Sequence, residues 1–137
     1  TGMRKQSEAI KRLCNSKSKV SSHYFIKNNG EVVNLVPDLY TAWHAGESIW
    51  KKYKSLNKYS IGIEINNPGH GNEYKKFYAM QIKSLIKLLK FLIKKYRIKK
   101  QNILGHSDIS PNRRTLYRAI ISRCFPQYEP PILRWVH

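Results

Sequence analysis

The fold is decided by residues 59–67, which have the sequence YSIGIEINN. In an extended strand, successive side chains point to opposite faces of the sheet. The two faces of this stretch differ, with Ile61, Ile63 and Ile65 on one and Gly62, Glu64 and Asn66 on the other. The pattern predicts a central strand whose isoleucines pack under a helix and whose second face carries polar chemistry.

Glu64 is the most informative residue of this stretch. A carboxylate inside an apolar strand is costly to bury unless a cation, a metal or hydrogen-bond donors meet it. The alternative is that Glu64 lies on an edge strand and faces water. Gly62 favours the first interpretation, because a missing side chain beside Glu64 leaves room for another group. We therefore expect Glu64 to open into a cleft.

Periodicity and turn residues place further elements around this strand. The predicted elements are a helix at residues 6–15 capped by Ser7, strands at 20–26 and 31–36 joined by a turn at 27–30, a helix at 74–96 and a last strand at 101–106. The longer helix is amphipathic. Its lysines recur at intervals of four, three and four residues, as Lys83, Lys87, Lys90 and Lys94. Its predicted apolar side comprises Ile82, Leu85, Ile86, Leu89, Leu92 and Ile93. We expect that side to pack on the sheet and the lysines to lie in solvent, although contact of the lysines with a membrane surface is an alternative.

Two loops carry residue types that suit a functional site. Residues 103–114, ILGHSDISPNRR, predict a strand that ends at a cleft with His106 just after Gly105. A histidine in that position suits a metal ligand or a proton carrier, or else a hydrogen-bonded structural residue. Residues 42–46, AWHAG, are too short and mixed for a regular element, and a loop of this kind usually forms the wall of a site.

Composition limits the classes of protein that the chain can belong to. Its 137 residues suit one globular domain, and no apolar run approaches the roughly 20 residues that a membrane helix needs. The formal net charge of +18 would attract anions such as nucleic acid, acidic lipid or a wall polymer. A bias towards Lys, Ile and Asn also explains that charge. The chain has no zinc finger, aromatic-rich RNA motif or helix-turn-helix, so we do not expect it to bind nucleic acid.

Four short blocks in this order carry a resemblance to a known family: residues 21–26 SSHYFI, 42–46 AWHAG, 60–65 SIGIEI and 105–109 GHSDI. Together they closely resemble the zinc-dependent N-acetylmuramoyl-L-alanine amidases of the type-2 amidase family, which are related in fold to peptidoglycan recognition proteins. The resemblance covers about residues 1–114. It implies an α/β fold in which helices flank a mixed central sheet and a zinc cleft lies along one edge. It also implies hydrolysis of the amide between the lactyl group of N-acetylmuramic acid and L-alanine.

The resemblance also assigns roles to individual residues. His106 resembles a ligand of the single zinc ion, and Glu64 resembles the carboxylate that moves protons. Trp43, His44 and Asn66 would shape the groove for the glycan and the stem peptide. The partner would be peptidoglycan or a muropeptide, with the chain expected to be a monomer in the bacterial cell envelope or periplasm.

Two of the family's three zinc ligands have no counterpart in this sequence. We expect the first ligand, with the first strand of the family's sheet, to lie upstream of Thr1. Alignment on Pro111 puts Arg114 where the family has a catalytic lysine and Leu116 where it has an acidic ligand. Arg114 keeps the charge needed to hold an oxyanion but does not release a proton. Leu116 has no atom that binds zinc.

Composition changes near this point as well, because the last lysine is Lys100 and all later positive charges are arginines. We therefore divide the chain into an amidase-like domain at residues 1–115 and a divergent tail at 116–137. Two functions follow from the sequence: an N-acetylmuramoyl-L-alanine amidase, in a truncated or impaired copy, or a catalytically silent module that binds peptidoglycan.

Overall fold

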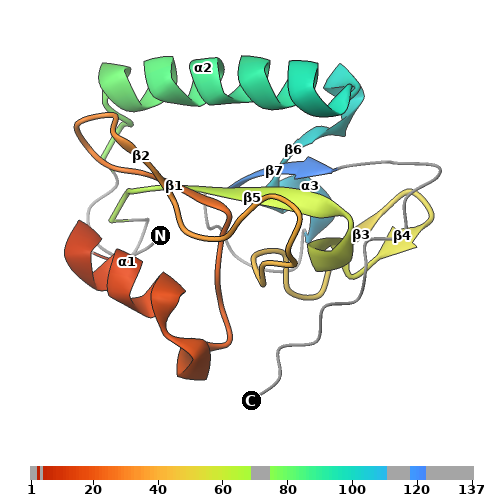
Figure 1. The fold of residues 1–137 in the computed structure, drawn as a ribbon, viewed down its shortest axis with the longest axis horizontal. Coiled ribbons are helices and arrows are strands. Elements are labelled where there is room, and N and C mark those ends of the chain that lie inside the picture. The colour runs from red at the N-terminus through yellow and green to blue at the C-terminus, as the bar shows by residue number, and fades with distance from the viewer. Residues whose placement is uncertain (1–2, 4, 69–74, 111–117, 123–137) are drawn as a thin grey trace.

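A five-stranded mixed sheet forms the centre of the molecule (Figure 1), and the sequence predicts a mixed sheet but not the strand β7 at Arg118–Ser122. The computed structural model describes residue 3 and residues 5–68, 75–110 and 118–122. Along the sheet the order is β2-β1-β5-β7-β6, formed by Val32–Asn34, Tyr24–Ile26, Ser60–Ile65, Arg118–Ser122 and Ile103–Gly105. β1 and β5 are parallel and the other neighbours are antiparallel.

Helices cover both faces of this sheet. The helices are α1 at Gln6–Cys14, α2 at Ala79–Tyr96 and α3 at His106–Ile109, with short 3-10 turns η1 at Ser16–Ser18, η2 at Leu56–Lys58 and η3 at Lys100–Asn102. α2 lies along one face, whereas α1, α3 and a small hairpin of β3 (Ile49–Trp50) and β4 (Tyr53–Lys54) lie on the other (Figure 1). The predicted α/β architecture with helices on both sides is therefore confirmed.

The central strand behaves as its alternation predicts. All six residues of β5 are buried, because the strand has neighbours on both edges and elements packed on both faces. Ile61, Ile63 and Ile65 form one core cluster with Leu88 and Leu92 of α2. Burial of each such side chain contributes roughly 1.5–3 kcal/mol, so this contact fixes α2 on the sheet.

α2 is rotated relative to the predicted helix. Its most buried residues are Gln81, Leu88 and Leu92. Of the predicted apolar side, Leu85, Leu89, Leu92 and Ile93 pack in the core as predicted, whereas Ile82 and Ile86 are 38% and 47% exposed. Gln81 explains the rotation, because its side chain accepts a hydrogen bond from the Tyr78 backbone and donates one to the backbone oxygen of Asn66. The predicted start at residue 74 lies outside the described residues, and residues 75–78 are not helical. The four lysines of the stripe are exposed, as predicted.

The N-terminal elements are shorter than predicted. α1 begins at Gln6 after Lys5, which makes no side-chain capping bond, so the prediction of Ser7 as the cap is wrong. Ala9 and Leu13 of α1 pack against Phe25 of β1. β1 and β2 keep only three residues each.

The turn between β1 and β2 is confirmed at residues 27–30. The Lys27 N–H donates to the Glu31 oxygen and the Gly30 N–H donates to the Lys27 oxygen. Gly30 has a φ of +83°, and a Cβ there would lie 2.8 Å from the backbone oxygen of Met80. A glycine is therefore needed both for the turn and for the approach of α2.

Part of the segment predicted as a divergent tail lies inside the sheet. β7 runs between β5 and β6 and pairs with both strands. Residues 116–117 and 123–137 lie outside the described residues, so the predicted division after residue 115 stays a prediction.

Asp38 links the loop after β2 to the end of α2. Its carboxylate accepts hydrogen bonds from the hydroxyls of Tyr24 and Tyr96, each at 2.6 Å, and from Lys95 at 3.0 Å. Burial by itself would raise the pKa of Asp38, but the hydrogen bonds from the two tyrosines and the lysine outweigh it and hold that pKa below its usual value. The ionised form of Asp38 is thus part of the folded structure.

Replacing Asp38 with Asn should therefore remove a pH-dependent part of the stability. Because the folded-state pKa is lowered, this contribution is present above the unfolded-state pKa near 3.8 and is lost as the pH falls through the folded-state pKa. We expect Asp38→Asn to lower the free energy of unfolding by about 2 kcal/mol at neutral pH, with the difference shrinking below about pH 4. Urea denaturation across this pH range measures it. A difference that does not vary with pH would contradict the role of the carboxylate.

Candidate active site

Gly62 and His44 are in direct contact on the face of the sheet opposite α2. A Cβ built on Gly62 would lie 2.2 Å from Cγ of His44, and the His44 side chain is only 1% exposed. The room that Gly62 leaves beside Glu64 is therefore filled by an imidazole ring. Because Gly62 is not among the described residues with positive φ, the need for glycine is steric.

The 42–46 loop is held in place by η2 and the start of β5. The side-chain oxygen of Asn57 accepts hydrogen bonds from the backbone N–H groups of His44 and Ala45, at 3.0 and 2.7 Å. The Ser60 hydroxyl donates to the Leu56 oxygen at 2.6 Å, so it accepts from Nε2 of His44 at 3.3 Å. His44 thus has a fixed orientation at the site although its loop has no regular structure.

His23 lies behind His44 and is fully buried. Its Nδ1 accepts a hydrogen bond from the Gly62 N–H at 3.0 Å, and its Nε2 donates to the Tyr40 backbone oxygen at 2.9 Å. The two imidazoles meet edge to face, with ring centroids 5.6 Å apart. Sequence reasoning gave His23 no role, although a histidine beside the apolar residues of a strand is the same signal that singled out Glu64.

Glu64 lies on a strand with neighbours on both edges and is 1% exposed, so the interpretation of an edge-strand glutamate facing water is wrong. Along the chain it alternates with Ile63 and Ile65, which contact α2. Its side chain is therefore on the same sheet face as Gly62 and His44.

The register of β7 relates Glu64 to His106. Ala119 lies opposite Ile63 of β5 and opposite Gly105 of β6. Glu64 follows Ile63 and His106 follows Gly105, so the two residues lie towards the same end of the sheet. His106 is 3% exposed and begins α3, on the face away from α2, rather than ending the strand as predicted. Asp108 accepts a hydrogen bond from the Gly105 N–H at 2.6 Å and so supports this loop.

The predicted groove residues differ in their surroundings. Trp43 is 50% exposed, and its backbone N–H donates to the Ser21 hydroxyl. Asn66 is buried, and its side-chain amide donates to Asn28 at 2.8 Å, which ties the end of β5 to the β1–β2 turn. Arg114 and Leu116 lie outside the described residues. The substrate-binding role of Trp43, His44 and Asn66 stays a prediction.

The described residues do not form a complete metal site. Within residues 3, 5–68, 75–110 and 118–122, no group of three or more His, Cys, Asp or Glu side chains could hold a metal ion. Both ring nitrogens of His23 are used in hydrogen bonds to the backbone. The donor set of this part of the chain therefore does not fit the three-ligand zinc site of the resemblance.

Comparisons with known proteins agree with this fold and with these blocks. A family model described as N-acetylmuramoyl-L-alanine amidase matches residues 1–116. The N-acetylmuramoyl-L-alanine amidase AmiD of Escherichia coli is 40% identical over 107 residues, covering 69% of this chain and 39% of AmiD. The 1,6-anhydro-N-acetylmuramyl-L-alanine amidase AmpD of Enterobacter cloacae is 38% identical over 96 residues, covering 70% of this chain and 49% of AmpD.

Solved structures give the same result. The structure of E. coli AmiD with its substrate anhydro-N-acetylmuramic acid-L-Ala-D-gamma-Glu-L-Lys superimposes with a TM-score of 0.71 at 37% identity, covering 79% of this chain and 46% of that one. AmpDh3 of Pseudomonas aeruginosa gives a TM-score of 0.77 at 30% identity, covering 83% of this chain and 50% of that one. The chain thus spans about two-fifths to one-half of the length of these relatives.

The contact between Gly62 and His44 leads to a testable expectation. Gly62→Ala should lower the free energy of unfolding by about 1–3 kcal/mol, because the new methyl group overlaps the imidazole ring. The double variant Gly62→Ala/His44→Ala should be less destabilised than the sum of the single variants, since His44→Ala removes the overlapping atoms. Denaturant unfolding of the four proteins measures the coupling. Purely additive costs would show that the ring does not rest on Gly62.

Proposed function

The chain belongs to the N-acetylmuramoyl-L-alanine amidase family, and we propose that it acts on the amide between N-acetylmuramic acid and L-alanine in peptidoglycan fragments. The observation that supports this most directly is the position of Glu64. A carboxylate is buried on the central strand, on the same sheet face as His44 and towards the same end of the sheet as the start of α3 at His106. A buried, oriented carboxylate is the group that such a hydrolysis needs to move protons.

The proposed substrates are muropeptides, that is, muramic acid derivatives that carry a short stem peptide. AmiD was solved with an anhydro-N-acetylmuramic acid tripeptide, and AmpDh3 with an anhydromuramic pentapeptide. The exposed indole of Trp43 offers this chain a flat apolar surface for a sugar ring or a peptide side chain. Such substrates lie in the bacterial cell envelope, where we propose that the chain acts as a monomer. Among the described residues, no helix has the length and apolarity to cross a membrane.

In this proposal Glu64 accepts a proton from the attacking water and delivers a proton to the leaving amine of L-alanine. The same carboxylate can serve in both steps, because it is regenerated when the amine leaves. Arg114 would place a positive charge near the oxyanion of the tetrahedral intermediate. His44 would form the wall of the site next to Glu64, held by Gly62 and Ser60.

A zinc ion is implied for this chain by the family resemblance alone. His106 is the side chain of this chain that would hold it, but the described residues do not complete a group of three donors. Leu116, at the position of the family's acidic ligand, supplies none. We therefore assign no step of the reaction to a metal ion.

The incomplete set of zinc donors among the described residues favours a second candidate function, a module that binds muropeptides without cutting them. Such a module would retain Trp43 and the expected substrate groove but would not hydrolyse the amide. The two candidates differ in one measurable property, the release of free stem peptide from a bound muropeptide.

Glu64→Gln tests the proposed hydrolysis. The amide keeps the size of the carboxylate but accepts no proton, so release of stem peptide should fall at least about a hundredfold while muropeptide binding is retained. Chromatography of the released peptide and calorimetric titration measure the two quantities. The matched control is Glu47→Gln, an exposed glutamate just after the 42–46 loop, which should change neither.

The outcomes separate the two candidates. Unchanged release in Glu64→Gln would overturn the role of Glu64. Binding without release in the unmodified chain would identify the silent module.

Zinc binding supplies an independent test of the departures from the family. We expect the purified chain to bind zinc weakly, and Leu116→Asp to raise the affinity at least about tenfold, because it restores a carboxylate ligand. Leu116→Ala is the control, which supplies no donor. Competition with a chromophoric chelator measures both. Tight stoichiometric zinc in the unmodified chain would mean that other donors complete the site, for which Glu129 and His137 are candidates by residue type.

A further inference from the structure

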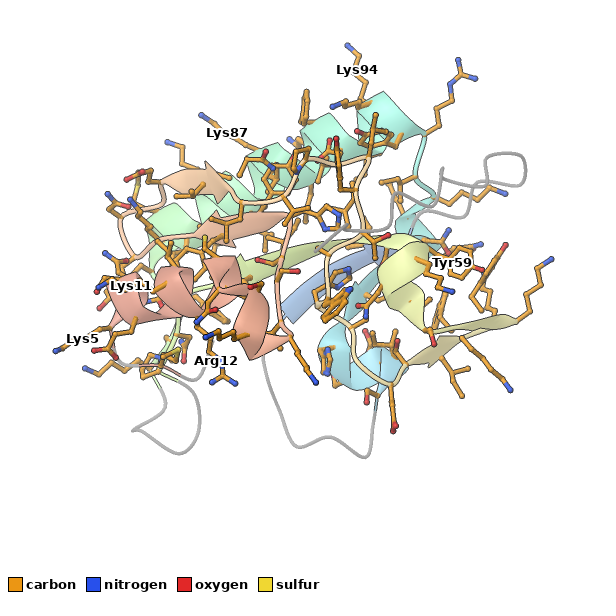
Figure 2. The ribbon with its side chains drawn as sticks, turned by 60° about the horizontal axis from the view of Figure 1, so that its bottom comes forward. Lys5, Lys11, Arg12, Tyr59, Lys87 and Lys94 are labelled. Carbon is orange, nitrogen blue, oxygen red and sulfur yellow. The ribbon has the colours of Figure 1, made fainter. Side chains whose placement is uncertain are left out.

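The outward surface of α2 carries positive charge that no acidic residue of the helix offsets. Its four stripe lysines are all exposed, and the sequence of Ala79–Tyr96 contains neither Asp nor Glu. The fifth lysine of the helix, Lys95, bonds to Asp38 and is not part of the stripe. Lys87 and Lys94 point away from the body of the molecule (Figure 2).

Exposed apolar side chains border this lysine stripe on both sides. Met80 and Phe91 are each 54% exposed, and Ile82 and Ile86 are 38% and 47% exposed. With 3.6 residues per turn, Ile86 lies one turn before Lys90, and Phe91 lies one turn after Lys87. Single exposed apolar residues are common on proteins, but here four of them flank one stripe of lysines on one helix.

We propose that this surface of α2 docks on the headgroup region of an anionic phospholipid bilayer. The lysines would be attracted to the lipid phosphates, and their long apolar stems suit the boundary between headgroups and acyl chains. The flanking apolar side chains would enter that boundary. Nucleic acid and other soluble polyanions match the lysines equally well but leave these apolar residues in water, so the bilayer is the better match.

The docking surface and the candidate active site lie on opposite sides of the molecule. α2 covers the sheet face that carries Ile61, Ile63 and Ile65, whereas Glu64 and His44 are on the other face. A chain bound through α2 would therefore present its site away from the bilayer. Docking through α2 involves neither Glu64 nor His106 and does not depend on hydrolysis.

Co-sedimentation with lipid vesicles tests the inference. The chain is mixed with vesicles of phosphatidylcholine alone or of phosphatidylcholine with phosphatidylglycerol, at about 0.15 M salt. We expect binding only to the anionic vesicles. The variant K83Q/K87Q/K90Q/K94Q should reduce the partition coefficient on the order of a hundredfold.

A second variant removes the same charge from the other side of the molecule. K11Q/R12Q/K17Q/K19Q changes exposed residues on and after α1, and it should keep most of the binding because these positions lie across the sheet from α2. Figure 2 labels Lys11 and Arg12 on α1. The variant M80Q/I86Q tests the apolar part and should weaken binding to vesicles several-fold without weakening binding to a short DNA duplex.

Three results would overturn the proposal. Equal losses in the α2 and α1 lysine variants would mean that net charge alone drives binding. No binding to anionic vesicles would remove the docking surface. Binding to the DNA duplex that depends on the α2 lysines, together with vesicle binding that is insensitive to M80Q/I86Q, would assign the surface to a soluble polyanion.

Discussion

The arrangement of the site depends on the close approach of three chain segments at Gly62. The N–H of Gly62 donates to Nδ1 of His23, its oxygen accepts the N–H of His23, and its missing side chain admits the ring of His44. β1, β5 and the 42–46 loop are therefore joined at one residue. Any side chain at this position would separate the loop from the strand, and with it the wall of the site from Glu64.

This contact also explains how a loop without regular structure is held accurately. Loops usually differ from their flanking strands in mobility, yet here the imidazole is buried, and its loop is bonded to Asn57 through two backbone groups. Glu64 in turn belongs to β5, whose six residues are all buried. Rigid support of this kind is what a catalytic or binding group needs, because a displaced group loses its effect on the substrate.

The alternation of side chains was sufficient to predict β5 and its two faces, because its period of two is unambiguous and one face is purely isoleucine. Residue periodicity did not predict the rotation of α2 about its axis. Gln81, which was not among the predicted apolar residues, is buried because its side chain bonds to the backbone of Asn66. Residue periodicity also did not predict β7, because five residues in a segment of unusual composition are too few to show a clear alternation. Pairing with β5 and β6 assigns them to the sheet. For the site, Glu64 and His106 were predicted from local pattern and family resemblance, and their roles stay predictions. The orientation of His23 could not be predicted, because it depends on two backbone partners far away in sequence.

The hydrogen bonds of His23 restrict what can occupy its position. One end of the side chain has to accept a hydrogen bond from the Gly62 amide, and the opposite end has to donate one to the Tyr40 carbonyl. Lysine and arginine offer donors only, and aliphatic residues offer neither. A neutral imidazole satisfies both ends, and among the remaining polar side chains a carboxamide comes nearest to doing so. Variation at position 23 is therefore limited by the direction of hydrogen bonding as well as by size, because an apolar substitution of equal volume would leave the Gly62 amide and the Tyr40 carbonyl without these two bonds.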